Sequence, residues 1–146
     1  MRRHTLLVML LVVLTVSFAT AQEEDPALFA VGALGASNLY NAYFLLGTLA
    51  DGYATDAYTA DFTDELARDV IGLSESATEV LEEMLSSPGL SPSDAQLIGR
   101  MADAHELLIN QAWGLISYVE DQNDTQDWFR YRRLSWEAIR ELLDLE

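Results

Sequence analysis

Hydrophobic residues recur at intervals of three and four along most of this chain, a spacing that places them on one face of an α-helix. The clearest example is the segment 61–87. Its apolar positions are Leu66, Val70, Leu73, Ala77, Val80, Leu81 and Met84. Charged residues, mostly acidic, occupy much of the rest of this segment, which predicts an amphipathic helix with one side in water. The sequence Ser86-Ser87-Pro88-Gly89 is expected to end that helix.

The same spacing predicts a helix over 91–121 and another over 124–145. Ser91 precedes Pro92, and Asp94 lies three residues after Ser91, so the third helix has the pattern of a capping box with proline in its first turn. The fourth helix is expected to begin at Asp124 or Thr125, either of which can cap a helix.

The first predicted helix covers 26–58 and differs from the others because no charged residue occurs between Pro26 and Ala50. Such a neutral stretch can indicate a membrane span, but Asn38 and Asn41 lie near its middle and glycines reduce its hydrophobicity. We therefore expect this helix to be buried on several sides within the protein.

Short breaks at about 59–60, 88–90 and 122–123 separate the four segments, and short connections make sequential helices antiparallel neighbours. The sequence predicts an all-α protein, a single antiparallel up-down-up-down four-helix bundle formed by residues 22–146.

Residues 1–21 have the pattern of a signal peptide. Arg2 and Arg3 precede an apolar run from Thr5 to Phe18, and Ala19-Thr20-Ala21 provides small residues for cleavage. We expect an exported protein, periplasmic or extracellular, with no transmembrane span after cleavage.

The chain is strongly acidic, with 24 Asp and Glu against 8 Arg, no Lys and a net charge of −16. Removal of Arg2 and Arg3 with the signal peptide would leave −18, since the first 21 residues contain no acid. Such a protein is repelled by nucleic acid, which excludes that class of partner. A saline environment would screen the self-repulsion, and this is our hypothesis for the acid excess.

Metal and nucleophilic chemistry lack the residues that they need. The chain has no Cys, and the residue three before His105 is Ala102, so the Glu-x-x-His pairs of di-iron bundles are missing. We predict no catalytic residue, no metal site and no cofactor. Non-covalent haem held by His105 and Met84 is the narrow alternative. Otherwise His105 is expected to border the core, bonded to Asp103 or another carboxylate.

Two groups of residues are candidates for ligand binding besides His105. In the first helix Ser37, Asn41 and Thr48 form a polar line, with Asn38 beside it. If buried, these side chains need partners. They either line a pocket inside the bundle or bond across it, for example to Gln111, and fix the helix register.

The second group is basic. Arg130, Arg133 and Arg140 lie in the fourth helix among aromatic residues and could hold an anionic ligand or the acidic segment of a partner. The alternative is internal pairing, with Arg133 bonded to Glu137 and the group facing the acids of the 61–87 helix.

The primary hypothesis is therefore a non-enzymatic exported bundle with a protein-interaction or structural role. One alternative is a small-ligand or haem-type binder that uses the bundle interior. A second is an enzyme acting on an anionic substrate at the fourth-helix arginines. The small residues of the first helix also permit a homodimer.

Overall fold

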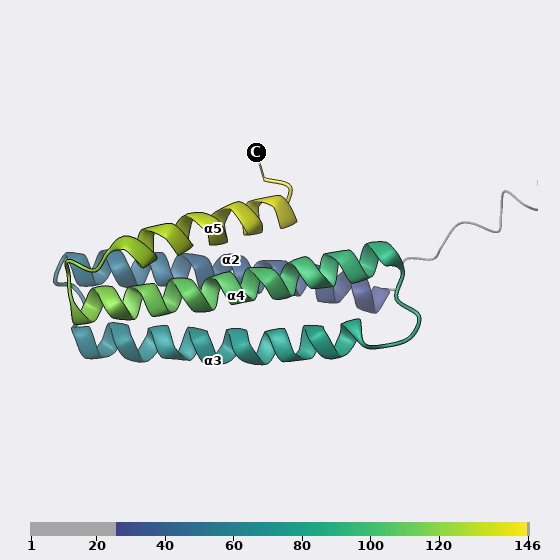
Figure 1. Cartoon of the computed structure of the whole chain (residues 1–146), viewed down its shortest axis with the longest axis horizontal. Helices are drawn as coiled ribbons and strands as arrows, with labels where there is room; N and C mark the ends of the chain where they lie inside the picture. Colours follow the sequence, from purple (N-terminus) through teal and green to yellow (C-terminus); the bar gives the residue numbers. More distant parts are fainter. Residues whose placement is uncertain (1–25, 146) are drawn as a thin grey trace, which may run out of the picture.

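The computed structural model describes residues 26–145, which form four helices and their connections. These are α2 (Pro26–Ala54), α3 (Ala60–Leu85), α4 (Pro92–Glu120) and α5 (Gln126–Leu142) (Figure 1). The prediction of an all-α bundle of four helices is confirmed. The predicted signal peptide lies outside the described residues.

Helix α2 ends four residues before its predicted end because the chain folds back on itself. The carbonyl of Gly52 accepts hydrogen bonds from the backbone N–H groups of Ala57 and Tyr58, at 2.8 and 3.0 Å. Asp56 has a φ of 57°, in the left-handed region that reverses a helix end. The ring of Tyr58 then packs so closely on Gly52 that a Cβ there would overlap it.

The starts of α3 and α4 are capped by hydroxyl side chains. The hydroxyl oxygen of Thr59 accepts from the backbone N–H of Phe62 at 3.3 Å. The hydroxyl oxygen of Ser91 accepts from the N–H of Asp94 at 3.1 Å, and Pro92 follows at the first helical position. The predicted cap at Ser91 and the proline in the first turn are confirmed, whereas the Asp94 carboxylate bonds the Ser91 hydroxyl and not its backbone N–H as a capping box requires. Such caps contribute about 1 kcal/mol each.

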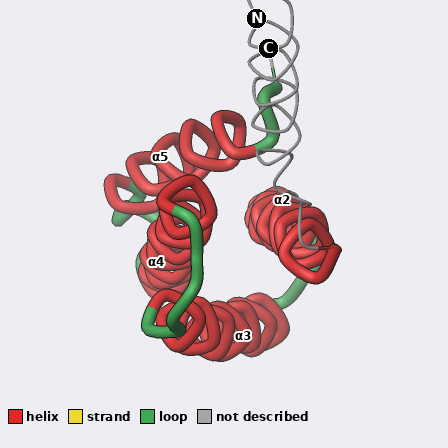
Figure 2. The backbone as a smooth tube through the Cα atoms, turned by 90° about the vertical axis from the view of Figure 1, so that its right-hand side faces the viewer, coloured by secondary structure: helices red, strands yellow, loops and turns green. Residues whose placement is uncertain are grey.

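Helix α4 is the central element of the bundle. It packs along α3 and α5 and also contacts α2, whereas α3 and α5 do not touch (Figure 2). The core consists of aliphatic residues from all four helices, with Leu39, Leu46, Leu108 and Leu115 fully buried in its middle. In cross-section the four helices therefore form a rhombus, with α2 and α4 in contact across its short diagonal.

Helix α2 is only half covered, which contradicts the expectation that it is buried on several sides. Large apolar side chains lie exposed on it, namely Phe29, Leu34, Tyr40, Phe44 and Leu45. None of the helices in residues 26–145 is long and apolar enough to cross a membrane. One side of the neutral stretch is therefore buried in the core, and the other leaves large apolar side chains in solvent, which can mark an interaction site.

Helix α5 is much shorter than its neighbours, with 17 residues against 29 in both α2 and α4. It begins at the tight corner after α4 and stops before the other end of the bundle, where α2 and α4 continue without it (Figure 1). One end of the bundle consequently lacks its fourth helix.

Candidate functional site

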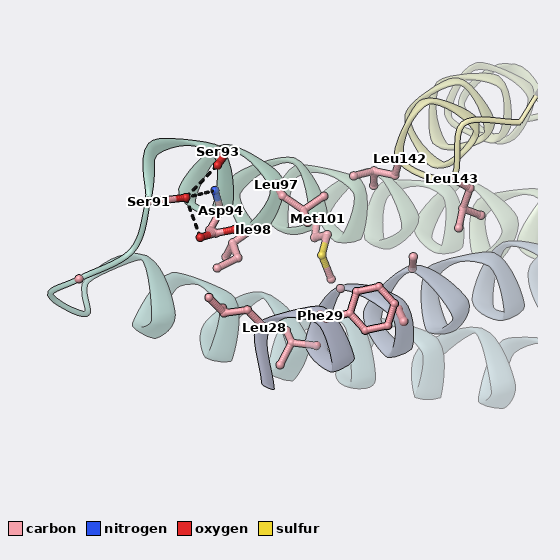
Figure 3. A pocket seen from close by; sticks show the side chains of 15 residues that line it. Leu28, Phe29, Ser91, Ser93, Asp94, Leu97, Ile98, Met101, Leu142 and Leu143 are labelled. Atoms are coloured by element: carbon pink, nitrogen blue, oxygen red, sulfur yellow. Dashed lines mark hydrogen bonds between the residues drawn. The ribbon is translucent and has the colours of Figure 1, made fainter. Parts of the chain in front are cut away.

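An open cleft of about 790 Å³ lies at the end of the bundle that α5 does not reach. Its walls come from the first turns of α2 and α4, and its inner end is formed by Leu142 and Leu143 at the end of α5 (Figure 3). The apolar side chains around it are those of Leu28, Phe29, Val31, Leu97, Ile98 and Met101. This volume falls within the range of about 300–1,000 Å³ that is typical of ligand sites.

The register of the helices explains why the cleft exists. Arg100 of α4 pairs with Glu141 at 3.4 Å, so Leu142, the last residue of α5, is level with Gly99, and the seven residues from Pro92 to Ile98 extend past α5. At 1.5 Å per residue this overhang is about 10 Å long. On the other wall, Tyr43 of α2 lies against Trp136 of α5 with ring centroids 5.4 Å apart. The six residues of α5 after Trp136 reach only the level of residue 37 in α2.

Small residues give the cleft its depth on the α2 side. Gly32, Ala33 and Ala36 line it, and a Cβ built at Gly32 would meet only the tip of Leu97, at 3.6 Å. At Gly35 the terminal methyl of Met101 lies in the space that a Cβ would take. Met101 is a flexible side chain, so this part of the wall can repack around a bound group.

The polar part of the lining is a closed hydrogen-bond cluster at the start of α4. The Ser91 hydroxyl donates to the carboxylate of Asp94 at 2.6 Å, and the hydroxyl oxygens of Ser91 and Ser93 are 2.8 Å apart (Figure 3). Asp94 carries the single charge among the described lining residues. These groups cap α4, so the lining combines apolar side chains along its walls with a polar end at the start of α4.

None of the residues that the sequence suggested for binding lines this cleft. The sequence nevertheless contained a signal for it, because the predicted fourth helix was the shortest of the four. In an antiparallel bundle with short connections, a short last helix must leave the end of the first and third helices uncovered. The neutral start of α2 is the surface that is left open.

The polar line of α2 does not enter the bundle interior. Ser37, Asn38, Asn41 and Thr48 are all exposed, and the Thr48 hydroxyl donates to the carbonyl of Phe44 at 2.9 Å in its own helix. The interpretations that these residues line an interior pocket or bond to Gln111 are therefore wrong. The reason is the half-covered position of α2, which turns this side of the helix to solvent.

His105 lies inside the core rather than at its border, with 2% of its surface exposed. Its Nδ1 has no hydrogen-bond partner within the described residues, so the expected bond to Asp103 is absent. Burial lowers the pKa of the imidazole because the charged form loses its hydration. The amide of Gln111 and the hydroxyl of Ser135 are likewise buried without a partner there.

The structure separates His105 from Met84, which the haem alternative requires to face each other. Arg68 of α3 stacks over Trp113 of α4, 5.4 Å from the ring centroid, and this contact sets the antiparallel register. Sixteen residues further along α3, Met84 is level with Leu97 of α4. That position is eight residues, or about 12 Å, from His105.

Arg130, Arg133 and Arg140 of α5 are exposed and do not converge on one site. Arg133 pairs with Glu137 at 3.6 Å, Arg130 lies over the ring of Tyr131, and Arg140 occupies the last turn. The prediction that they face the acids of the 61–87 helix is wrong, because α4 lies between α3 and α5. The predicted pair of Arg133 with Glu137 is confirmed.

No protein-family model matches this chain, and no curated protein or solved structure matches it. The fold and the cleft define it as an all-α four-helix bundle with an apolar site at one open end.

Proposed function

We propose that this protein is an exported, non-enzymatic binding protein that holds an apolar ligand or protein segment in the cleft between α2, α4 and α5. The observation that carries the proposal is the apolar cleft of about 790 Å³ at the uncovered end of the bundle. A concave site of this size, lined by large apolar side chains with a few polar groups, is a typical place for a bound ligand or protein segment.

Phe29 is the residue that most favours binding over a purely structural role. It lines the cleft, and 71% of its surface is exposed in the free protein. Full burial of a phenylalanine side chain is worth about 1.5–3 kcal/mol, so covering the exposed part would contribute about 1–2 kcal/mol to a complex. That amount corresponds to about 5- to 30-fold in affinity.

The chain provides a matched control for Phe29. Leu34 lies on the same helix with 72% of its surface exposed, yet it does not line the cleft. Replacing either residue by Ala removes an exposed apolar side chain at little cost to the fold. The two variants therefore differ chiefly in their effect on the cleft.

The test is a titration with the neutral dye N-phenyl-1-naphthylamine, whose fluorescence rises in apolar sites. We expect saturable binding to one site, about 5- to 30-fold weaker in Phe29→Ala and unchanged in Leu34→Ala. Absence of saturable binding, or equal weakening by the two substitutions, would contradict a binding role for the cleft.

Export is tested separately on the protein recovered from its own host. Native mass spectrometry should give the mass of a chain that begins at Gln22. A retained ligand would appear as a reproducible added mass. A mass that includes residues 1–21 in the extracellular or periplasmic fraction would contradict cleavage of a signal peptide.

A further inference from the structure

The cleft has the position and length of a missing piece of helix. It begins at the end of α5, where Leu142 and Leu143 form its inner end, and it lies between the parts of α2 and α4 that α5 does not reach. Beyond this point α4 extends by seven residues and α2 by eleven, from Pro26 to Ala36. These overhangs are about 10 and 16 Å long, which is two to three helical turns.

The volume of the cleft agrees with a helix that is half embedded. A helix with side chains is about 10–12 Å in diameter, so 14 Å of it occupies about 1,100–1,600 Å³. Half of that volume is about 550–800 Å³, and the 790 Å³ of the cleft lies at the upper end of this range. The walls on three sides are also helical, and an amphipathic helix docked in an apolar groove is a common mode of recognition.

The charge of this protein near the cleft indicates which charged side chains the polar face of a docked helix should carry. The chain carries −16, Asp94 lines the cleft, and Asp144 lies just beyond the end of α5. Arg100, near the inner end, is paired with Glu141. A second copy of this chain or an anionic amphiphile would be repelled by this field, whereas a cationic partner would be attracted and steered to it.

We infer that the occupant of the cleft is a short amphipathic helix of a cationic partner, two to three turns long. Its apolar side packs on Phe29 and Leu97, and its Lys or Arg side chains lie towards Asp94. The four-helix arrangement is thereby completed along the whole length of the bundle. This inference rests on the proposed function and specifies the partner class.

The inference is tested with three synthetic eleven-residue helical peptides that share one Leu face and differ only in their polar positions. These positions are Lys in one peptide, Gln in the second and Glu in the third. At 50 mM NaCl we expect the Lys peptide to bind at least tenfold more tightly than the Gln peptide, and the Glu peptide more weakly still. The difference should shrink at 500 mM NaCl, because salt screens the attraction.

Two variants locate the binding while changing the net charge equally. Ala33→Arg places a cation in the cleft wall, whereas Ala30→Arg places it on an exposed position of the same helix that does not line the cleft. We expect Ala33→Arg to weaken the Lys peptide at least tenfold and Ala30→Arg less than threefold. Equal effects would mean diffuse attraction to the acidic surface and would overturn the inference.

The outcomes for the inference and for the proposed function are distinguishable. If the neutral dye binds in the cleft but the Gln and Lys peptides bind equally, the cationic partner is wrong and the binding role stands. If sedimentation velocity shows a dimer that Ala33→Arg dissociates, the occupant is a second copy and the inference fails. If neither dye nor peptide binds, both proposals fail.

Discussion

Gly114 provides the sharpest test of how α5 is fixed to α4. It is buried at the crossing of the two helices, where a Cβ would lie 2.7 Å from the backbone nitrogen of Trp128 and 2.9 Å from the carbonyl carbon of Asp127. The obstructing atoms belong to the backbone of the first turn of α5. Gly114→Ala therefore has to push the start of α5 away from α4.

The magnitude follows from two opposing terms. Replacing Gly by Ala in a helix interior stabilises a protein by about 1 kcal/mol through backbone entropy. Overpacking of a tight contact costs about 1–3 kcal/mol, and the upper end applies here because a helix must move rather than a flexible side chain. The displaced Trp128 is also buried in the core. We expect Gly114→Ala to be destabilised by about 1–2 kcal/mol.

Gly72→Ala is the matched control, since Gly72 lies within α3 and a Cβ there meets nothing within 4 Å. It should be stabilised by about 1 kcal/mol, so the two variants should differ by about 2–3 kcal/mol. With an m-value of about 2 kcal/mol per molar urea, their unfolding midpoints should differ by about 1–1.5 M. Urea melts followed by circular dichroism measure this difference. A Gly114→Ala variant as stable as Gly72→Ala would refute the close approach of α4 and α5.

Three further predictions concern charge. Because burial lowers the pKa of His105, the unfolded chain binds more protons below about pH 6.5, so this residue makes stability fall as the pH drops through that range. Urea melts between pH 7.5 and 5.5 should show a steeper loss in the wild type than in His105→Gln, and equal slopes would contradict it. Thermal melts should rise in midpoint from low to molar NaCl as repulsion within the acidic chain is screened; a flat midpoint would exclude a saline adaptation. The double replacement of Arg133 and Arg140 by Gln should leave both the melting temperature and dye binding nearly unchanged, because exposed ion pairs contribute little. A large loss of either would give these arginines a role that their exposure does not suggest.

The helices were predictable from sequence because periodicity and caps are local. Ser91, Pro92 and Asp94 mark the start of α4 regardless of what packs on it, and the apolar spacing of α3 requires one covered face. The end of α2 was missed because the left-handed residue that ends it is Asp56 rather than glycine, the usual signal for such an end.

The candidate site was harder to predict because it depends on relations between helices. The neutral first helix was interpreted as buried, yet whether Phe29 and Leu34 are covered depends on how far α5 extends. For the same reason the α5 arginines could not be placed, since α4 separates them from α3. Their spacing shows which of them share a face of the helix, but it does not show which other helix packs against that face.

The position of α2 also has a consequence for the order in which the chain folds. All three connections are short, five or six residues each, but α2 contacts α4 more extensively than α3, the helix to which it is joined, and its Tyr53 hydroxyl donates to the carbonyl of Val119, 66 residues away. Because the main contact of α2 joins residues far apart in sequence and is smaller than the α3–α4 and α4–α5 contacts, α3, α4 and α5 should assemble first and α2 should dock last. Its first turns, held by the fewest neighbours, should be the first to open in native-state hydrogen exchange. The first of the four described helices to be synthesised is thus the last to dock, and its apolar surface stays accessible throughout folding.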